Sequence, residues 1–330
     1  MLRYILVFIF CITLHTPAFA MKVINESLEH EGAKRVFNVY IPDSVQNKSN
    51  IPVVFVLHGG GGNAAQAAQT IQMHKTGEKY GFITVYPQGS QAGRSAKMHL
   101  WNSGKCCGQS VENTADDVGF ISKVIDVMVS KYSADPKRIY STGHSNGAKM
   151  SYTLACYLSD KITAIAPNGG QDYERSCDLK RPVPVMHIHG KADKCAVYGG
   201  SKECGGCFSS VFQSIGIPMR LKQWECPPVP DMVAQWAGFN GCLNSTQETF
   251  QKGDVTCNTY TQCKAGADVT LCSIEHAGHT WAGASSEHTL CKRNPNGRLC
   301  KAAKEAVGAT NYDINNNEFM WQFFSRYKME

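Results

Sequence analysis

A serine set between glycines carries the strongest chemical signal in this chain. Gly143-His144-Ser145-Asn146-Gly147 has the pattern G-x-S-x-G, and it lies between residues 138–142, which favour a strand, and residues 148–158, which favour a helix. A serine on so tight a strand-to-helix turn projects from the edge of the sheet, and a Cβ at either glycine would collide with neighbouring backbone. The pattern predicts Ser145 as a nucleophile, but the chain has 30 glycines, so the rest of the sequence must exclude a chance match.

A serine nucleophile needs a base that takes its proton and an acid that orients the base. Where a G-x-S-x-G turn supplies the nucleophile, both partners follow the serine, with the acid before the histidine. Asp193 meets the requirement for the acid, because it comes shortly after an apolar run at residues 183–188 and a turn at Gly190. We therefore predict Asp193 as the acid and not as an ordinary turn-capping residue.

The base is predicted from the same chain order. His279 lies in a glycine-containing loop after the predicted strand at residues 269–274, and it is our choice. His276 is the alternative, since it is three residues nearer to the end of that strand. His187 and His189 lie within or at the end of a strand that precedes the predicted acid, so we expect them to be packed or hydrogen-bonded instead.

A run of glycines supplies candidate donors for the negative charge that forms on an attacked carbonyl. His58-Gly59-Gly60-Gly61-Gly62 follows the apolar run at residues 52–57, and loops of this HGGG type direct backbone N–H groups at an oxyanion. We predict the N–H groups of Gly60 and Asn146 as the pair of donors. A phosphate-binding loop would end in Gly-Lys-Ser or Gly-Lys-Thr, and Asn63-Ala64-Ala65 follows here instead. The predicted chemistry is a two-step acyl transfer through an acyl-enzyme on the serine, without metal or cofactor.

The elements around these residues alternate between strand and helix. Apolar runs that are typical of strands buried on both faces of a parallel sheet occur at residues 52–57, 82–86, 138–142, 162–166, 183–188 and 269–274. Residues 35–41 alternate like a half-buried strand. Helices are predicted at residues 148–158, 231–239, 316–327 and after a capping box at Thr114 and Asp117. We therefore predict an α/β fold with a mostly parallel, doubly wound central sheet flanked by helices.

Further motifs accompany the predicted triad. They are Trp101-Asn102, Cys106-Cys107-Gly108, Asp116-Asp117-Val118-Gly119-Phe120 and Gly278-His279-Thr280-Trp281. With the HGG run, the G-x-S-x-G turn and Asp193, they resemble the secreted esterases known as polyhydroxybutyrate depolymerases, feruloyl esterases and acetylxylan esterases, which have the α/β-hydrolase fold. The resemblance extends from about residue 35 to about residue 325 and places the triad at Ser145, Asp193 and His279.

The resemblance also implies a substrate-binding role for two tryptophans. Trp101 and Trp281 would line the cleft, where an aromatic ring packs against an acyl or sugar group, and ordinary packing is the alternative for both. The family commonly has Pro after Gly-His-Thr-Trp, and this chain has Ala282 there. That departure bears on substrate preference and not on the triad.

The first 20 residues read as a secretory signal peptide and not as part of the fold. Arg3 precedes an apolar run at residues 5–14, and Ala18-Phe19-Ala20 forms a small-x-small cleavage site. The run is too short to span a bilayer with ease, and no later stretch is apolar and long enough. We expect a secreted or periplasmic protein with no membrane anchor, whose residues 21–330 form a single catalytic domain.

The cysteine content agrees with export to an oxidising compartment. Of fifteen cysteines Cys11 lies in the leader, and the remaining fourteen allow up to seven disulfides whose pairing the sequence leaves open. Residues 195–226 read as a disulfide-stapled insertion that forms a lid or a wall of the cleft. Cys204-Gly205-Gly206-Cys207 also has the C-x-x-C spacing of a zinc ligand pair, but no second pair stands at finger-like spacing, so we expect no metal.

Net charge and chain length distinguish between the possible functions. The net charge of +6 is spread without long basic runs, so nucleic-acid binding is not expected. The leading hypothesis is a serine carboxylesterase acting on feruloyl or acetyl esters of plant polysaccharides, with a polyhydroxybutyrate depolymerase or oligomer hydrolase as the first alternative. A prolyl-oligopeptidase type of peptidase would need a propeller domain for which there is no room. All three members of a triad are predicted, which argues against a catalytically silent binding protein on a hydrolase scaffold.

Overall fold

The computed structural model of the protein describes residues 21–91, 98–103, 115–171, 176–214, 224–284, 291 and 294–330. The expected signal peptide at residues 1–20, the pair Cys106-Cys107 and the expected helix cap Thr114 lie outside these residues. Within the described part of the chain, no helix combines the length and the apolar character needed to cross a membrane.

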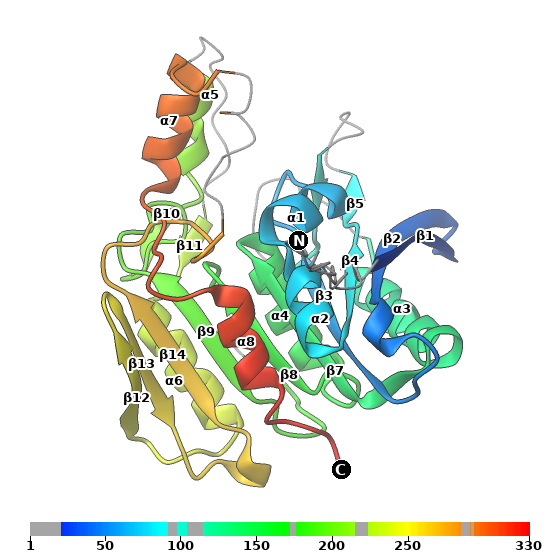
Figure 1. Ribbon diagram of the computed structural model, residues 1–330. Coiled ribbons are helices and arrows are strands. Elements are labelled where there is room, and N and C mark those ends of the chain that lie inside the picture. The colour runs from blue at the N-terminus through cyan, green and yellow to red at the C-terminus, as the bar shows by residue number, and fades with distance from the viewer. Residues whose placement is uncertain are drawn as a thin grey trace, which may run out of the picture.

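One mixed sheet forms the centre of the molecule (Figure 1). Along the chain its strands are β1 (Met21–His30), β2 (Ala33–Pro42), β3 (Ile51–Leu57), β4 (Ile83–Pro87), β7 (Ala134–His144), β8 (Ala164–Asn168), β9 (Val185–Gly190), β12 (Thr246–Lys252), β13 (Val255–Tyr260) and β14 (Val269–Ile274). Across the sheet they lie in the order β1-β2-β4-β3-β7-β8-β9-β14-β13-β12. The six central strands, β4, β3, β7, β8, β9 and β14, pair in parallel. Antiparallel strands form both edges, with β1 and β2 at one edge and β13 and β12 at the other. The predicted mostly parallel sheet is confirmed.

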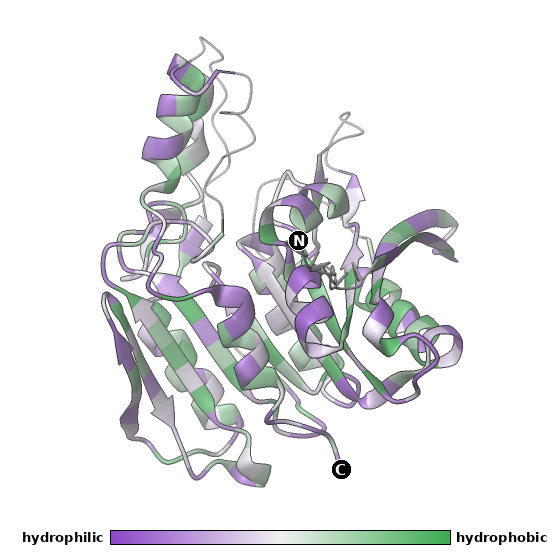
Figure 2. Ribbon diagram, viewed as in Figure 1, coloured by the Kyte–Doolittle hydropathy of each residue, from purple (hydrophilic) through white to green (hydrophobic). Residues whose placement is uncertain are grey.

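Helices cover both faces of this sheet. They are α1 (Ala64–Ile71), α2 (Met73–Tyr80), α3 (Asp117–Tyr132), α4 (Asn146–Tyr157), α6 (Val229–Phe239) and α8 (Asn316–Phe324). Along β3 the side chains alternate: Val53, Phe55 and Leu57 pack on the face with α3, α4 and α6, whereas Val54 and Val56 pack on the face with α1, α2 and α8. Because both faces are buried, the strand is apolar at every position. Figure 2 shows hydrophobic colouring over much of the other central strands, with some hydrophilic bands among it.

The start of α3 differs from its prediction. Asp116 is the N-cap, and its side chain accepts a hydrogen bond from Gly119 N–H at 2.8 Å. Asp117, expected to close a capping box, instead forms a buried ion pair with Arg35 of β2 at 2.6 Å. Its second oxygen accepts the N–H of Asn102 at 2.7 Å. One carboxylate therefore joins α3 to β2 and to Asn102. The residue before Asn102, Trp101, is hydrogen-bonded to Asn146 of the serine turn.

The predicted insertion contributes to an arm that stands beyond the end of the sheet (Figure 1). Its parts are β10 (Ser201–Cys204), α5 (Cys207–Ser214) and β11 (Trp224–Cys226), and α5 packs against α7 (Arg298–Val307) from near the end of the chain. The disulfides that involve the arm are Cys195–Cys207, Cys204–Cys226 and Cys291–Cys300. The two cysteines of the C-x-x-C pattern thus bond to different partners, so this pair is not a zinc site.

Three further disulfides staple the body of the described chain. They are Cys156–Cys177, Cys242–Cys263 and Cys257–Cys272. The last of these joins neighbouring residues on the paired strands β13 and β14. Together with the arm, the described residues contain six disulfides, which agrees with the expectation of an oxidised protein.

Candidate active site

The turn between β7 and α4 holds Ser145 in a strained backbone conformation. Its φ of 57° and ψ of −116° lie in a region that residues with a side chain rarely adopt. An added Cβ on Gly147 would lie 2.2 Å from the carbonyl oxygen of Leu57, and one on Gly143 would lie 2.6 Å from the carbonyl of Gly147. The two glycines of the motif are therefore required by the close approach of β3, the turn and α4.

The glycine run after β3 lies directly against this turn. A Cβ on Gly59 would be 3.7 Å from Cβ of Ser145, and one on Gly60 would be 3.5 Å from Cβ of Asn146. The side chain of Asn146 is buried and clamps the backbone of Trp101, accepting its N–H at 2.7 Å and donating to its carbonyl at 3.1 Å. The two predicted oxyanion donors, Gly60 and Asn146, are thus brought side by side at the nucleophile.

The amides of the glycine run differ in their hydrogen bonds. Gly61 N–H donates to the carbonyl of His99 at 2.9 Å, and Gly62 N–H donates to that of Gly59 at 3.0 Å. Among the described residues, no backbone carbonyl accepts the N–H of Gly60. The N–H of Gly59 also has no such acceptor among these residues, and Gly60 differs from Gly59 by lying beside Asn146, the other predicted donor.

Trp101 is not on the wall of the cleft, which corrects the expectation from family resemblance. Its side chain is fully buried, and its indole N–H donates to the carbonyl of His58 at 3.0 Å. The ring packs against His58 at a centroid distance of 4.9 Å. Trp101 therefore supports the glycine run from the interior, and the sequence could not distinguish this from a surface role because both use an aromatic ring.

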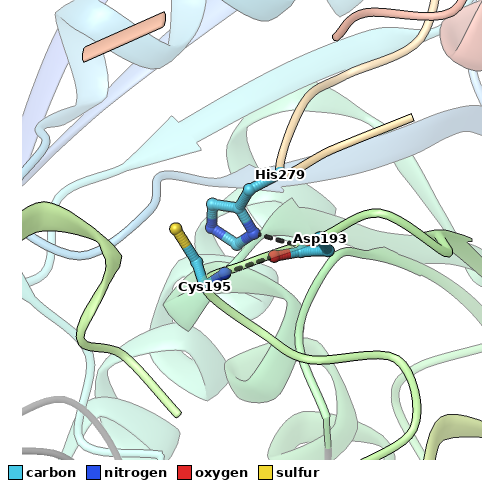
Figure 3. Close-up of side chains that lie close together, drawn as sticks. All are labelled: Asp193, Cys195 and His279. Atoms are coloured by element: carbon cyan, nitrogen blue, oxygen red, sulfur yellow. Dashed lines mark hydrogen bonds and ion pairs between the residues drawn. The ribbon is translucent and has the colours of Figure 1, made fainter. Parts of the chain in front are cut away.

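The predicted acid and base meet in the interior at the end of the sheet (Figure 3). Nδ1 of His279 lies 2.7 Å from Oδ2 of Asp193, and both side chains are almost fully buried. The other carboxylate oxygen, Oδ1, accepts the N–H groups of Cys195 and Ala196 at 2.7 and 2.8 Å. The sulfur of Cys195 lies near His279 but is bonded to Cys207, so these three residues are not a set of metal ligands.

The charge of Asp193 is stabilised by its neighbours. Burial on its own would raise the pKa of this carboxyl, but the adjacent His279 and the hydrogen bonds from His279 and His189 hold the pKa of Asp193 below its usual range. The carboxylate therefore stays ionised at neutral pH. An ionised carboxylate orients the imidazole with Nδ1 protonated, which leaves Nε2 of His279 as the nitrogen that can accept a proton.

A buried chain of hydrogen-bonded groups supports Asp193 from behind. His189 Nε2 lies 2.7 Å from the carbonyl oxygen of Ala196, which can only accept, so this nitrogen carries a proton. Along the chain, His187 Nε2 lies 2.9 Å from His189 Nδ1, and the Tyr152 hydroxyl lies 2.8 Å from His187 Nδ1. The same His189 Nε2 lies 3.4 Å from Asp193 Oδ2. Burial keeps the pKa of His187 well below its ordinary value, so its ring stays neutral.

Asn168 at the end of β8 joins the nucleophile turn to the loop of the base. Its carbonyl accepts Ser145 N–H at 3.0 Å, and its side-chain amide donates to His144 Nδ1 at 2.8 Å and to the carbonyl of Thr280 at 3.0 Å. The rings of His144 and His279 pack at a tilt with their centroids 4.5 Å apart, and burial lowers the pKa of His144 to about 3. Sequence reasoning missed Asn168, although a polar residue ending an apolar parallel strand beside the serine strand was a usable signal.

A cavity of about 620 Å³ opens over these residues. Ser145 and His279 both line it, with the glycine run on one side and Lys304, Val307 and the following loop on the other. Trp281 lines it as well, and its indole N–H donates to Asn317 at 3.0 Å. The side chains that line this cavity include no carboxylate.

The rival base lies away from this cavity. His276 is exposed, and its Nδ1 is 2.9 Å from Asp254 on the turn before β13. It is not among the residues that line the cavity. The backbone N–H of His279, in contrast, donates to the carbonyl of Val307 at the end of α7, which fixes the base loop against the arm.

Comparison with known proteins places this geometry in a family. The Esterase PHB depolymerase family matches residues 35–203, which covers half of the chain and includes the glycine run, the serine turn and Asp193. The chain belongs to this family. Among curated members, Feruloyl esterase B of Piromyces equi is 30% identical over 251 residues, covering 73% of this chain and 42% of that protein.

Two further relatives extend the comparison. The bifunctional acetylxylan esterase/xylanase XynS20E of Neocallimastix patriciarum is 29% identical over 177 residues, covering 54% of this chain and 24% of that protein. The chain thus spans less than half the length of these two curated relatives. The acetyl xylan esterase from Aspergillus awamori superposes with a TM-score of 0.55 at 15% identity, covering 78% of this chain and 94% of that one. This likeness shows a shared α/β-hydrolase-like fold.

The close approach at the serine turn leads to a first prediction. Gly147→Ala should prevent correct folding of the turn and abolish esterase activity, because its Cβ would lie 2.2 Å from the carbonyl oxygen of Leu57. Gly238→Ala in α6 is the matched control, since a Cβ there meets nothing within 4 Å. That control should be neutral or stabilising by up to ~1 kcal/mol in urea unfolding. A Gly147→Ala protein with normal stability and activity would contradict the packing described.

The histidine chain behind the acid leads to a second prediction. His189→Phe removes the N–H near Asp193 while keeping a ring of similar size, so Asp193 should lose its fixed position. We expect kcat per folded molecule to fall ~10- to 100-fold, as for a misplacement of about 1 Å in a catalytic site, with little change in KM. His276→Phe, at the exposed rival histidine, should leave kcat unchanged. Equal kcat values for the two variants would show that the chain is only structural.

Two buried neutral histidines lead to a third prediction. Burial is the main cause that lowers the pKa of His58 to about 4, and it lowers the pKa of His144 to about 3. Below about pH 6.5 the unfolded chain binds a proton at each site that the folded chain does not, so stability should fall as pH falls toward 4. The free energy of unfolding should drop by about 1.4 kcal/mol per pH unit for each histidine.

Urea unfolding between pH 4 and pH 7 measures this slope. His58→Gln should flatten the pH dependence, because glutamine does not titrate. His276→Gln, at an exposed site, should not flatten it. A wild-type stability that is constant over this range would refute the assignment of buried neutral histidines.

Proposed function

We propose that the protein is a serine carboxylic ester hydrolase in which Ser145, Asp193 and His279 form the catalytic triad. The observation that carries the proposal is the buried 2.7 Å pair of His279 and Asp193 beside a serine on a strained strand-to-helix turn. The cavity that Ser145 and His279 share offers room for a substrate. Membership of the Esterase PHB depolymerase family supports the same reaction.

The proposed reaction has two acyl-transfer steps. His279 Nε2 takes the proton of Ser145 Oγ as the oxygen attacks the ester carbonyl carbon, and the N–H groups of Gly60 and Asn146 bind the resulting oxyanion. The tetrahedral intermediate breaks its bond to the alcohol, which leaves with the proton from the imidazolium. Water then attacks the acyl-enzyme with its proton passing to His279, and that proton returns to Ser145 Oγ as the carboxylic acid is released. Asp193 stabilises the imidazolium in both steps.

We further propose that the substrates are feruloyl or acetyl esters of plant polysaccharides. The relatives named above include a feruloyl esterase and an acetylxylan esterase, which supports this choice. Trp281 on the cavity wall offers an aromatic surface for an acyl group. Export from the cell rests on the leader-like residues 1–20 and on the six disulfides of the described chain.

Ser145→Ala tests the proposal. Because the nucleophile would be lost, kcat for p-nitrophenyl acetate should fall by ~10⁴-fold or more, with the thermal unfolding midpoint unchanged. A fluorophosphonate probe should label the wild type and not this variant. Ser130→Ala, at an exposed serine of α3, is the matched control and should keep full activity and labelling.

The substrate class is measured with the same preparations. Methyl ferulate, acetylated xylan and hydroxybutyrate oligomers are compared by kcat/KM. Activity on the hydroxybutyrate oligomers alone would overturn the proposed substrate class while leaving the triad intact. Wild-type activity in Ser145→Ala would overturn the triad.

A further inference from the structure

A second hollow adjoins the catalytic cavity and crosses the outer surface of α1. Asn63 and Gln66 line both the cavity and this groove, so the two adjoin at these residues. The groove then passes Gln69 and Gln72 and ends at Tyr40 and His74. None of the residues that take part in the proposed acyl transfer lines this groove.

The groove is lined by neutral amides. Gln66, Gln69 and Gln72 are spaced three residues apart, and together with Asn63 they give the groove a row of side-chain amides. Among the described residues, no carboxylate, lysine or arginine lines the groove. Burial lowers the pKa of His74 to about 4, so this imidazole is also neutral at pH 7. A ligand held here by charge is therefore disfavoured.

Several of these groups are available to a ligand. The amide side chain of Gln69 and the hydroxyl of Tyr40 form no hydrogen bond with another side chain or backbone group of the described residues. Tyr40 is held in place, because its ring stacks on His74 at 4.5 Å and meets the edge of Tyr86 at 5.2 Å. His74 in turn is fixed by a hydrogen bond between its Nδ1 and the Tyr86 hydroxyl at 3.1 Å. The end of the groove is thus rigid and polar.

The chemistry of this lining selects among neutral ligands. An amide both donates and accepts hydrogen bonds, and so does a phenol hydroxyl. A sugar hydroxyl also does both, so it can pair with the amide of Gln69 and with the hydroxyl of Tyr40. A polyester chain between its ends carries only acceptors and apolar methylenes, so it offers no donor to the amide oxygen of Gln69 or to the hydroxyl oxygen of Tyr40.

We propose that the groove along α1 is a subsite for the oligosaccharide part of the ester substrate. The acyl group occupies the cavity at Ser145 and Trp281, and the sugar chain leaves over Asn63 and Gln66 toward Tyr40. This inference rests on the proposed esterase function and specifies which surface binds the leaving group. It assigns glycan recognition to α1 and not to the disulfide-bonded arm.

Gln69→Ala combined with Tyr40→Phe tests the subsite. Neither residue touches the catalytic machinery, so kcat and KM for p-nitrophenyl acetate should be unchanged. For acetylated xylo-oligosaccharides KM should rise ~3- to 10-fold, the loss expected for one or two hydrogen bonds made in competition with water. Gln247→Ala, on the exposed edge strand β12, is the matched control and should change neither value.

Direct binding separates this inference from the proposed function. Unsubstituted xylo-oligosaccharides are titrated into Ser145→Ala by NMR or calorimetry, with and without the two groove substitutions. Weaker binding in the groove variant supports the subsite even if no ester is hydrolysed, which would overturn only the esterase proposal. Equal binding, or an equal loss of activity on p-nitrophenyl acetate and on the oligosaccharide ester, would overturn the subsite.

Discussion

The close approach of three backbone segments at Ser145 is the constraint on which the site depends. Gly147 packs against the carbonyl of Leu57, and Gly143 packs against the carbonyl of Gly147, so β3, the turn and α4 touch without side chains between them. This contact brings the glycine run after β3 next to the N-terminus of α4. The strained φ of Ser145 is a result of the same contact, since the chain must reverse within one residue. The predicted nucleophile Ser145 and the predicted oxyanion donors Gly60 and Asn146 are thus all positioned by this one backbone contact.

The proposed acid and base, Asp193 and His279, are positioned in a different way, by hydrogen bonds between buried polar groups. Asp193 has partners on both oxygens, and His189, His187 and Tyr152 continue a hydrogen-bonded chain behind it. His189 Nε2 donates to the carbonyl of Ala196 and lies 3.4 Å from Asp193 Oδ2, so His279 remains the closer partner of this oxygen. Asn168 then connects the two halves by binding both the serine turn and the loop of the base.

Much of this arrangement follows from the sequence, and the exceptions have physical reasons. The parallel strands were predictable because burial on both faces makes them largely apolar, and β3 is apolar at every position. The edge strand β12 is exposed along most of its length and carries polar residues, so it gave no strand signal. Chain order indicated Asp193 and His279, whereas the support from His187 and Tyr152 depends on neighbours across β9 and α4 that no local pattern reveals. The expectation for Trp101 was wrong for another reason: residue type alone does not distinguish an aromatic ring in the interior from one that lines the cleft.

The bond between Cys195 and Cys207 anchors the start of α5 next to Asp193. Cys195 uses its backbone N–H to hold Asp193 and its sulfur to anchor the first residue of α5. The chain beyond that anchor can change in length or composition without transmitting the change to the carboxylate. The fold therefore contains a site for evolutionary variation, where insertions that alter access to the cavity leave the acid in place.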